Sequence, residues 1–205
     1  MNTTVFLVRH GQTKSNTNGF YMGRSNEDLN KAGYTQAHHL SSRLARLSID
    51  SIYTSPLQRA HATAAILNEP HQLELIVMED LTEVHLGDWE GLHMDEVKRR
   101  WPELWQQSRI DPSEITMPNG ENIREMAERA VRAFETVIET NQGKQTIMVT
   151  HQYIVKAIVA HALGVSNSIF RKFEIDNASL SAIQVGNDNF RLITLNDTSH
   201  LEGLE

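Results

Sequence analysis

The sequence predicts an α/β fold, a three-layer α/β/α sandwich with a mostly parallel central sheet and a small inserted cap. Patterns of short buried strands alternate with helix patterns of about 10 to 20 residues, which is typical of right-handed βαβ units with a sheet covered on both faces. The 205 residues are 40% hydrophobic and 22% charged. This composition predicts a single globular domain over residues 1–205, with the cap inserted at about 86–118.

Each predicted element follows from its residue pattern. Short apolar runs predict strands over 4–9, 49–55, 73–78 and 145–150. Segments 179–185 and 189–195 predict a terminal hairpin around Gly186-Asn187-Asp188. Asn30 is predicted to cap a helix whose apolar face carries Gly33, Ala37, Leu40, Leu44 and Leu47. The longest helix has an unbroken apolar stripe, formed by Ile123, Met126, Ala127, Ala130, Val131, Phe134, Val137 and Ile138.

The segment of about 86–118 has a looser pattern, which is why it is predicted to be a cap and not a second domain. It contains tryptophans at positions 89, 101 and 105, and three prolines. Trp89, Trp101 and Trp105 either line the leaving-group side of a site or form the small core of the cap. The basic run 98–100 (Lys98-Arg99-Arg100) is either a clamp for a carboxylate or, as we prefer, a solvated helix face.

Composition excludes several classes of function. The chain has no cysteine, so it has neither disulfides nor thiolate chemistry, which fits a cytoplasmic protein. The formal net charge of −7 argues against nucleic acid as a partner. His151, Lys156 and His161 interrupt the apolar region 146–165, so we expect a buried strand and helix there and no membrane span. The N-terminus lacks the pattern of a signal peptide.

Three predicted strands end in polar or basic residues of one chemical kind. The first ends in Arg9-His10, the second runs into 55–59, and the fourth ends in Thr150-His151. Because the ligand crevice of a parallel sheet lies at the carboxyl ends of its strands, we expect these groups to meet in one site.

The helix start after the second strand predicts an anion site. Ser55 is predicted to cap this helix, with Pro56 at its first position and Gln58 completing a capping box. Arg59 then lies near a helix N-terminus, where a cation is unfavourable unless an anion binds there. The alternative is a surface arginine that turns toward solvent.

The end of the fourth strand repeats this arrangement. Thr150 is predicted to cap the helix 152–163, which His151 opens. A bound anion would favour the imidazolium form of His151. The alternative is a histidine with a structural role only.

These residues resemble the histidine phosphatase superfamily, which includes the cofactor-dependent phosphoglycerate mutases. The resemblance covers nearly the whole chain and is carried by five segments in order: "LVRHGQTKSN" at 7–16, "SPLQRAHATA" at 55–64, "LTEVHLGDWEG" at 81–91, "PNGEN" at 118–122 and "THQ" at 150–152.

The resemblance implies a role for each site residue. His10 would be the nucleophile that forms a phosphohistidine, and Glu83 the general acid. The phosphoryl oxygens would be surrounded by Arg9, Arg59 and His151. Asn16 would add a neutral donor. No metal and no cofactor would be needed, and the pair 38–39 (His38-His39) is interpreted as a polar helix face.

The sequence departs from the family pattern around the substrate. Met22 precedes Gly23 where the family commonly has glutamine, so either a contact to phosphate is lost or the Met22-Gly23 backbone supplies it. Gln152 follows the second histidine where glycine is usual. Asn177 resembles a late block of the family and otherwise shapes a turn. The expected partner is a small phosphorylated metabolite, and a homodimer is possible.

Three functions are compatible with such a site. We predict a metal-independent phosphatase, because the insertion is short and Thr13 stands where mutases usually have serine. A cofactor-dependent phosphoglycerate mutase is the main alternative. A non-catalytic phosphate-binding module would be expected to lack the nucleophile or the acid, whereas His10 and Glu83 are both present.

Overall fold

The computed structural model describes residues 2–186 and 189–204 and contains a six-stranded sheet in the order β3-β2-β4-β1-β5-β6. Strands β1 to β4 pair with one another in parallel, whereas β5 is antiparallel to both of its neighbours, β1 and β6. The mostly parallel sheet is therefore confirmed, while the predicted turn residues 187–188 lie outside the described residues. The strands are β1 (Thr3–Arg9), β2 (Ser51–Thr54), β3 (Leu75–Val77), β4 (Gln145–Thr150), β5 (Leu180–Gly186) and β6 (Asn189–Asp197).

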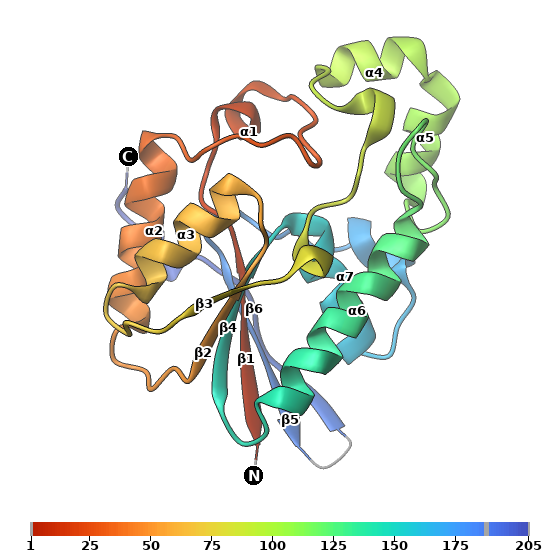
Figure 1. The fold of residues 1–205 in the computed structure, drawn as a ribbon. Helices are drawn as coiled ribbons and strands as arrows, with labels where there is room; N and C mark the ends of the chain where they lie inside the picture. The colour runs from red at the N-terminus through yellow and green to blue at the C-terminus, as the bar shows by residue number, and fades with distance from the viewer. Residues whose placement is uncertain (1, 187–188, 205) are drawn as a thin grey trace.

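Helices cover both faces of this sheet, which confirms the three-layer prediction (Figure 1). Residues of α2 and α3 share one buried cluster with the sheet, and residues of α6 and α7 share the other. The α-helices are α1 (Lys14–Asn18), α2 (Lys31–Leu44), α3 (Gln58–Asn68), α4 (Met94–Arg100), α5 (Pro102–Ile110), α6 (Ile123–Thr140) and α7 (Gln152–Ala162). The 3-10 turns are η1 (Glu79–Leu81), η2 (Gly87–Trp89), η3 (Asn167–Arg171) and η4 (Ser199–Leu201).

The cap on α2 forms as predicted. The Asn30 side chain accepts a 2.8 Å hydrogen bond from the Gly33 amide. Four of the five predicted apolar positions are buried within the helix. The fifth, Leu47, lies three residues beyond the helix end at Leu44, and is partly buried against the same cluster.

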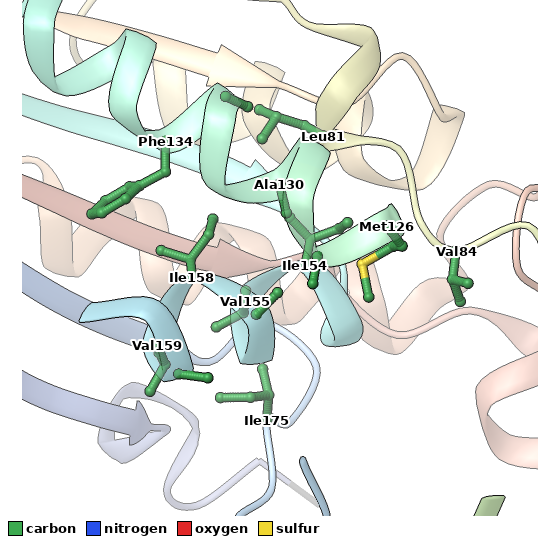
Figure 2. Packing of buried hydrophobic residues seen from close by; sticks show 14 of the residues in the cluster. Leu81, Val84, Met126, Ala130, Phe134, Ile154, Val155, Ile158, Val159 and Ile175 are labelled. Atoms are coloured by element: carbon green, nitrogen blue, oxygen red, sulfur yellow. The ribbon is translucent and has the colours of Figure 1, made fainter. Parts of the chain in front are cut away.

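The core between the sheet, α6 and α7 holds the largest buried cluster (Figure 2). Phe134 and Met126 on α6 are fully buried, as are Ile154 and Ile158 on α7. The apolar stripe predicted for α6 is confirmed, with Val131 and Ile138 at its half-exposed margins. This packing fixes the position of α7, whose first turn reaches the carboxyl ends of the strands.

The polar strand ends lie side by side. In the strand register Arg9 is paired with Thr150, and Thr54 with Val149, so the carboxyl ends of β1, β4 and β2 are adjacent. Helices α4 and α5 lie at the end of the molecule opposite the N-terminus (Figure 1). Within the described residues, no helix combines the length and the apolar character needed to cross a bilayer.

Candidate active site

A cavity of about 280 Å³ lies at the carboxyl ends of the strands. Four of the predicted catalytic residues line it: Arg9, His10, Arg59 and Glu83. All four predicted substrate-binding residues line it too: Asn16, Met22, Gly23 and Gln152. His151 lies behind this lining, fully buried, with its ring centroid 5.1 Å from that of His10.

The imidazole of His10 is held in one tautomer by its two neighbours. Nδ1 lies 2.7 Å from the Gly11 carbonyl oxygen, and Nε2 lies 3.2 Å from Arg59 Nε. A carbonyl only accepts and a guanidinium only donates, so Nδ1 carries the proton and Nε2 presents a lone pair. Burial, and then the cations Arg59 and Arg9, lower the pKa of His10 well below 6.5, so the imidazole is neutral.

The turn after β1 needs glycine because two backbone segments meet there. A Cβ atom on Gly11 would lie 2.6 Å from the carbonyl oxygen of Gly33 in α2. The His10 carbonyl accepts bonds from the Ala178 amide at 3.0 Å and from the Asn177 side chain at 3.2 Å. The backbone on both sides of the imidazole is therefore fixed by the fold.

Two arginines in the site have no carboxylate partner. Within the described chain neither Arg9 nor Arg59 forms an ion pair, and Arg59 is only 2% exposed. Arg59 donates to the Ser25 and Gly23 carbonyls at 2.7 Å, and Arg9 to the Ile175 carbonyl at 2.6 Å. Burial lowers the pKa of Arg9 to about 10, and its Nε is buried with no described acceptor. Unpaired buried cations are costly, so this geometry favours an anionic ligand.

The predicted capping box at the start of α3 is wrong. The helix begins at Gln58, its N-cap is Leu57, and no side chain of the cap residue bonds there. The Ser55 hydroxyl instead lies 2.8 Å from His151 Nε2, and it accepts a 3.3 Å bond from the amide of the N-cap residue Leu57, not from the first helical turn. The side-chain oxygen of Asn26, from a distant loop, accepts a 2.8 Å hydrogen bond from the Gln58 amide and so satisfies a free N–H group at the helix start.

His151 is positioned by contacts that the sequence did not indicate. It occupies the N-cap position of α7, whereas the predicted cap Thr150 donates its hydroxyl to the Leu81 carbonyl at 2.7 Å. Burial, then neighbouring positive charges, lower the pKa of His151 well below 6.5. These surroundings keep the histidine neutral, and the predicted imidazolium requires a bound anion. Its Nδ1 is buried without a partner among the described atoms.

Glu83 is the buried carboxyl group of the site. It is 8% exposed, and its two oxygens accept bonds from the Val84 amide at 2.9 Å and the Tyr153 amide at 3.3 Å. Burial raises the pKa of Glu83, although those amides and the charge of Arg59 oppose the rise. A raised pKa favours the protonated carboxyl that a general acid requires.

Arg129 supports the segment that carries Glu83, and it is not among the residues predicted from the sequence. Its guanidinium forms a bidentate pair with Glu121, at 2.7 and 2.9 Å. It also donates to the carbonyls of Asp80, Thr82 and Glu83, at 2.6 to 3.1 Å. A signal was present, because residue 129 falls three after Met126 and four before Ala133 on the buried stripe of α6. A charged residue on such a stripe indicates a buried pair.

Asn16 is oriented toward the cavity by its own neighbours. Its side-chain oxygen accepts bonds from the Thr13 amide at 3.0 Å and from Asn177 Nδ2 at 3.1 Å. Because the oxygen is occupied, the NH₂ group remains as the donor. Asn177 thus connects two parts of the site, beyond the turn-forming role that was its alternative.

The turn at Met22 and Gly23 is held by Glu90. The Glu90 carboxylate accepts bonds from the Arg24 amide, and from the Ser25 amide and hydroxyl, at 2.7 to 2.8 Å. Gly23 has a φ of +43°, and a Cβ atom there would lie 2.3 Å from Glu90. Arg59 bonds to this turn, so Glu90 indirectly positions that guanidinium.

The segment between η2 and α5 divides into a buried part and a solvated part. Trp89 is 1% exposed and lines the cavity, while Trp101 and Trp105 pack on the main core as partly buried residues. The basic run 98–100 is exposed and does not line the cavity, and two of its arginines pair with Glu96. Its interpretation as a solvated helix face therefore fits the structure.

Comparison with known proteins places this geometry in a family. Residues 5–198 match the family described as the histidine phosphatase superfamily (branch 1). The chain belongs to this superfamily. Phosphoserine phosphatase 1 of Hydrogenobacter thermophilus is 32% identical over 197 residues, 96% of this chain and 93% of that protein. The adenosylcobalamin/alpha-ribazole phosphatase of Escherichia coli is 28% identical, over 94% of this chain and 95% of that protein.

A solved structure superposes on nearly the whole chain. It is that of YhfR from Bacillus stearothermophilus, with a TM-score of 0.94 and 29% identity over 98% of this chain and 100% of that one. With named phosphatases among its relatives at full length, this chain is a phosphatase of the phosphoglycerate mutase-like type. Hydrolysis of small phosphomonoesters fits these findings.

Proposed function

We propose that this histidine phosphatase hydrolyses small phosphomonoesters in two steps, through a phosphohistidine at His10 and without a metal ion. The observation that carries the proposal is the fixed tautomer of His10. Its Nδ1 donates to the Gly11 carbonyl at 2.7 Å, and its Nε2 accepts from Arg59 Nε at 3.2 Å. A neutral, oriented imidazole at an unpaired cationic site is suited to attack phosphorus.

In the first step His10 Nε2 exchanges its hydrogen bond from Arg59 Nε for a bond to phosphorus, which frees that N–H to donate to the phosphoryl oxygens. The bond from phosphorus to the alcohol oxygen breaks, and its electron pair stays on that oxygen, which takes a proton from Glu83. In the second step the Glu83 carboxylate takes a proton from water as the water oxygen attacks phosphorus. The bond to Nε2 breaks, its electrons return to the imidazole, and inorganic phosphate leaves. One difficult displacement is thereby divided into two.

The surrounding donors would stabilise the charge on the transferred group. Arg9 and Arg59 already lack carboxylate partners in the described chain, and the Asn16 amide has its oxygen occupied. A bound phosphoryl dianion would also favour protonation of His151. Fixed cationic donors of this kind are the main source of catalysis in phosphoryl transfer.

The substrate-side residues and the cap complete the proposal. Met22, Gly23 and Gln152 line the cavity and are proposed to contact the substrate. Residues 1–205 are proposed to form one domain, with 86–118 as its cap, acting in the cytoplasm on a small phosphorylated metabolite. The names of relatives, phosphoserine phosphatase and alpha-ribazole phosphatase, indicate the range of candidate substrates.

Hydrolysis is preferred over mutase activity because relatives that match over nearly their full length are named phosphatases. A mutase must hold the carboxylate of phosphoglycerate with additional cations and exclude water. Residues 98–100 do not line the cavity, so any such clamp would have to come from the other cations of the lining, Arg109 and Arg171.

The proposal is tested by phosphate release from nitrophenyl phosphate and from a panel of metabolite phosphates, in the presence of EDTA. We expect turnover in the wild type and none above background in His10→Asn. Absence of turnover on every phosphomonoester would favour a binding module. Phosphoglycerate with a trace of bisphosphoglycerate tests the other alternative, because isomerisation much faster than phosphate release would identify a mutase.

A further inference from the structure

The cavity contains a second pair of arginines that the proposed mechanism does not use. Arg109, in the last turn of α5, and Arg171, the last residue of η3, line the same cavity as His10 and Glu83. Within residues 2–186 and 189–204 neither arginine forms an ion pair. In a protein with a net charge of −7, two such cations in one cavity require an explanation.

Arg171 is held so that part of its guanidinium remains available. Its Nε donates to the Ser108 backbone carbonyl at 3.0 Å, and Ser108 is 2% exposed. The Ser108 hydroxyl in turn donates to the Trp105 carbonyl at 2.7 Å. The terminal Nη groups of Arg171 have no acceptor in the described chain, so they can donate to an oxyanion.

The second pair of arginines lies on the leaving-group side of the phosphoryl site. The Tyr153 amide bonds to Glu83 Oε2 at 3.3 Å, and the Tyr153 side chain lines the cavity. The Tyr153 ring centroid lies 5.9 Å from that of Phe170, the residue that precedes Arg171 in η3. Tyr153 therefore joins the proposed acid to the segment that carries Arg171. Because Glu83 protonates the leaving oxygen, Arg171 faces the departing alcohol.

We infer that Arg171, assisted by Arg109, forms a second anion subsite that binds a negatively charged group on the alcohol portion of the substrate. The inference rests on the proposed function and narrows its substrate class to small alcohols that carry both the phosphoryl ester and a second oxyanion. A carboxylate and a second phosphate share this chemistry. The alternative is that Arg171 only ties η3 to α5, and that Arg109 only complements the C-terminal end of α5.

The test compares 3-phosphoglycerate, which carries a carboxylate, with glycerol 3-phosphate, which carries none. We expect the wild type to favour 3-phosphoglycerate in kcat/KM, and Arg171→Met to reduce that preference about tenfold or more, mainly through KM. Arg171→Lys should retain part of the preference, and Arg109→Met should show a smaller loss. Propanediol bisphosphate carries a second phosphate in place of the carboxylate. Comparing its kcat/KM with that of 3-phosphoglycerate shows which of the two anionic groups the subsite prefers.

The ratio of the kcat/KM values for two substrates, measured on one variant, does not depend on how much of that variant is folded. Arg100→Met removes an exposed cation of α4 that pairs with Glu96 outside the cavity, and should leave the ratio unchanged. An unchanged ratio in Arg171→Met, with both substrates still hydrolysed, would overturn the subsite. Calorimetry with the same two ligands gives the preference as a ratio of Kd values without turnover. A protein that binds with the expected preference but hydrolyses nothing would therefore refute the proposed function and not the subsite.

Discussion

The two ends of the cavity are built from different parts of the fold. The phosphoryl end is formed by residues at the strand ends and the first turn of α3, and these are buried: His10 is 4% exposed, Arg59 2% and Glu83 8%. The leaving-group end is formed by α5, η3 and loops, where Arg109 is exposed and Arg171 partly exposed. The core thus fixes the chemistry, while substrate choice depends on exposed connections that are free to vary.

Replacing the proposed acid at the phosphoryl end should cause the largest loss of activity. We predict that Glu83→Gln slows hydrolysis of alkyl phosphates by about 10²- to 10⁴-fold. Nitrophenyl phosphate should lose far less, because its leaving group needs little protonation. Since the acid must be protonated, wild-type activity should fall as pH rises through the raised pKa of Glu83, and this limb should be absent in the variant. Equal losses on both substrates would reject the acid role.

Arg129 tests whether the phosphoryl end depends on the core behind it. Arg129→Ala removes the bidentate partner of Glu121 and a donor to three carbonyls, although Glu121 keeps its bonds from Arg24 and the His85 amide. We therefore predict a loss of about 3 kcal/mol in the free energy of unfolding. Arg132→Ala, an exposed site on the same helix, should change stability by no more than about 0.5 kcal/mol. If Arg129 also positions Glu83, the ratio of alkyl to nitrophenyl phosphate hydrolysis should fall in the soluble fraction. A ratio equal to that of the wild type would limit Arg129 to a structural role.

The sequence predicted the phosphoryl end better than its supports. Burial patterns identified β1, β2 and β4, and strand adjacency then placed Arg9, His10 and His151 together. The predicted cap at Ser55 does not form, and the sequence could not show this, because the hydroxyl contacts a histidine 96 positions away. Local capping rules do not include such long-range competition.

The remaining parts of the site carried unequal sequence signals. Arg129 had one, since it falls on a buried stripe of α6. Arg171 had none, because only the tertiary fold brings η3 beside α5 and the cavity. The position of an exposed segment depends on few contacts, so residue patterns specify it weakly.

The buried histidines predict acid sensitivity that originates at the phosphoryl end. Unfolded imidazoles titrate near 6.5, and folding lowers the pKa of His10 and of His151 well below this value. The unfolded state therefore binds more protons as pH falls below about 6.5, and stability is lost there by up to about 2.7 kcal/mol per pH unit for two groups. Above this range the histidines contribute no pH dependence. In denaturant titrations at several pH values, His10→Asn should reduce the slope and the exposed His38→Asn should not. The same slope in both would contradict this assignment.

Met22 offers the smallest and most local test. Met22→Gln adds a hydrogen-bond donor at the phosphoryl end, and we predict that vanadate binds up to about tenfold more tightly, as measured by calorimetry. Met94→Gln places the same side chain elsewhere on the cavity wall and should leave vanadate binding unchanged. Tighter vanadate binding in both variants would contradict the assignment of Met22, and not Met94, to the phosphoryl end.

The central claim is that the imidazole of His10 carries the phosphoryl group between substrate and water. Rapid acid-free quenching of the enzyme with ³²P-labelled phosphomonoester, followed by peptide mass spectrometry, tests it directly. The expected result is an acid-labile, alkali-stable label on His10, absent from His10→Asn and more abundant in Glu83→Gln when nitrophenyl phosphate is the donor. Label on another residue, or steady turnover with no labelled protein at any time point, would contradict the account.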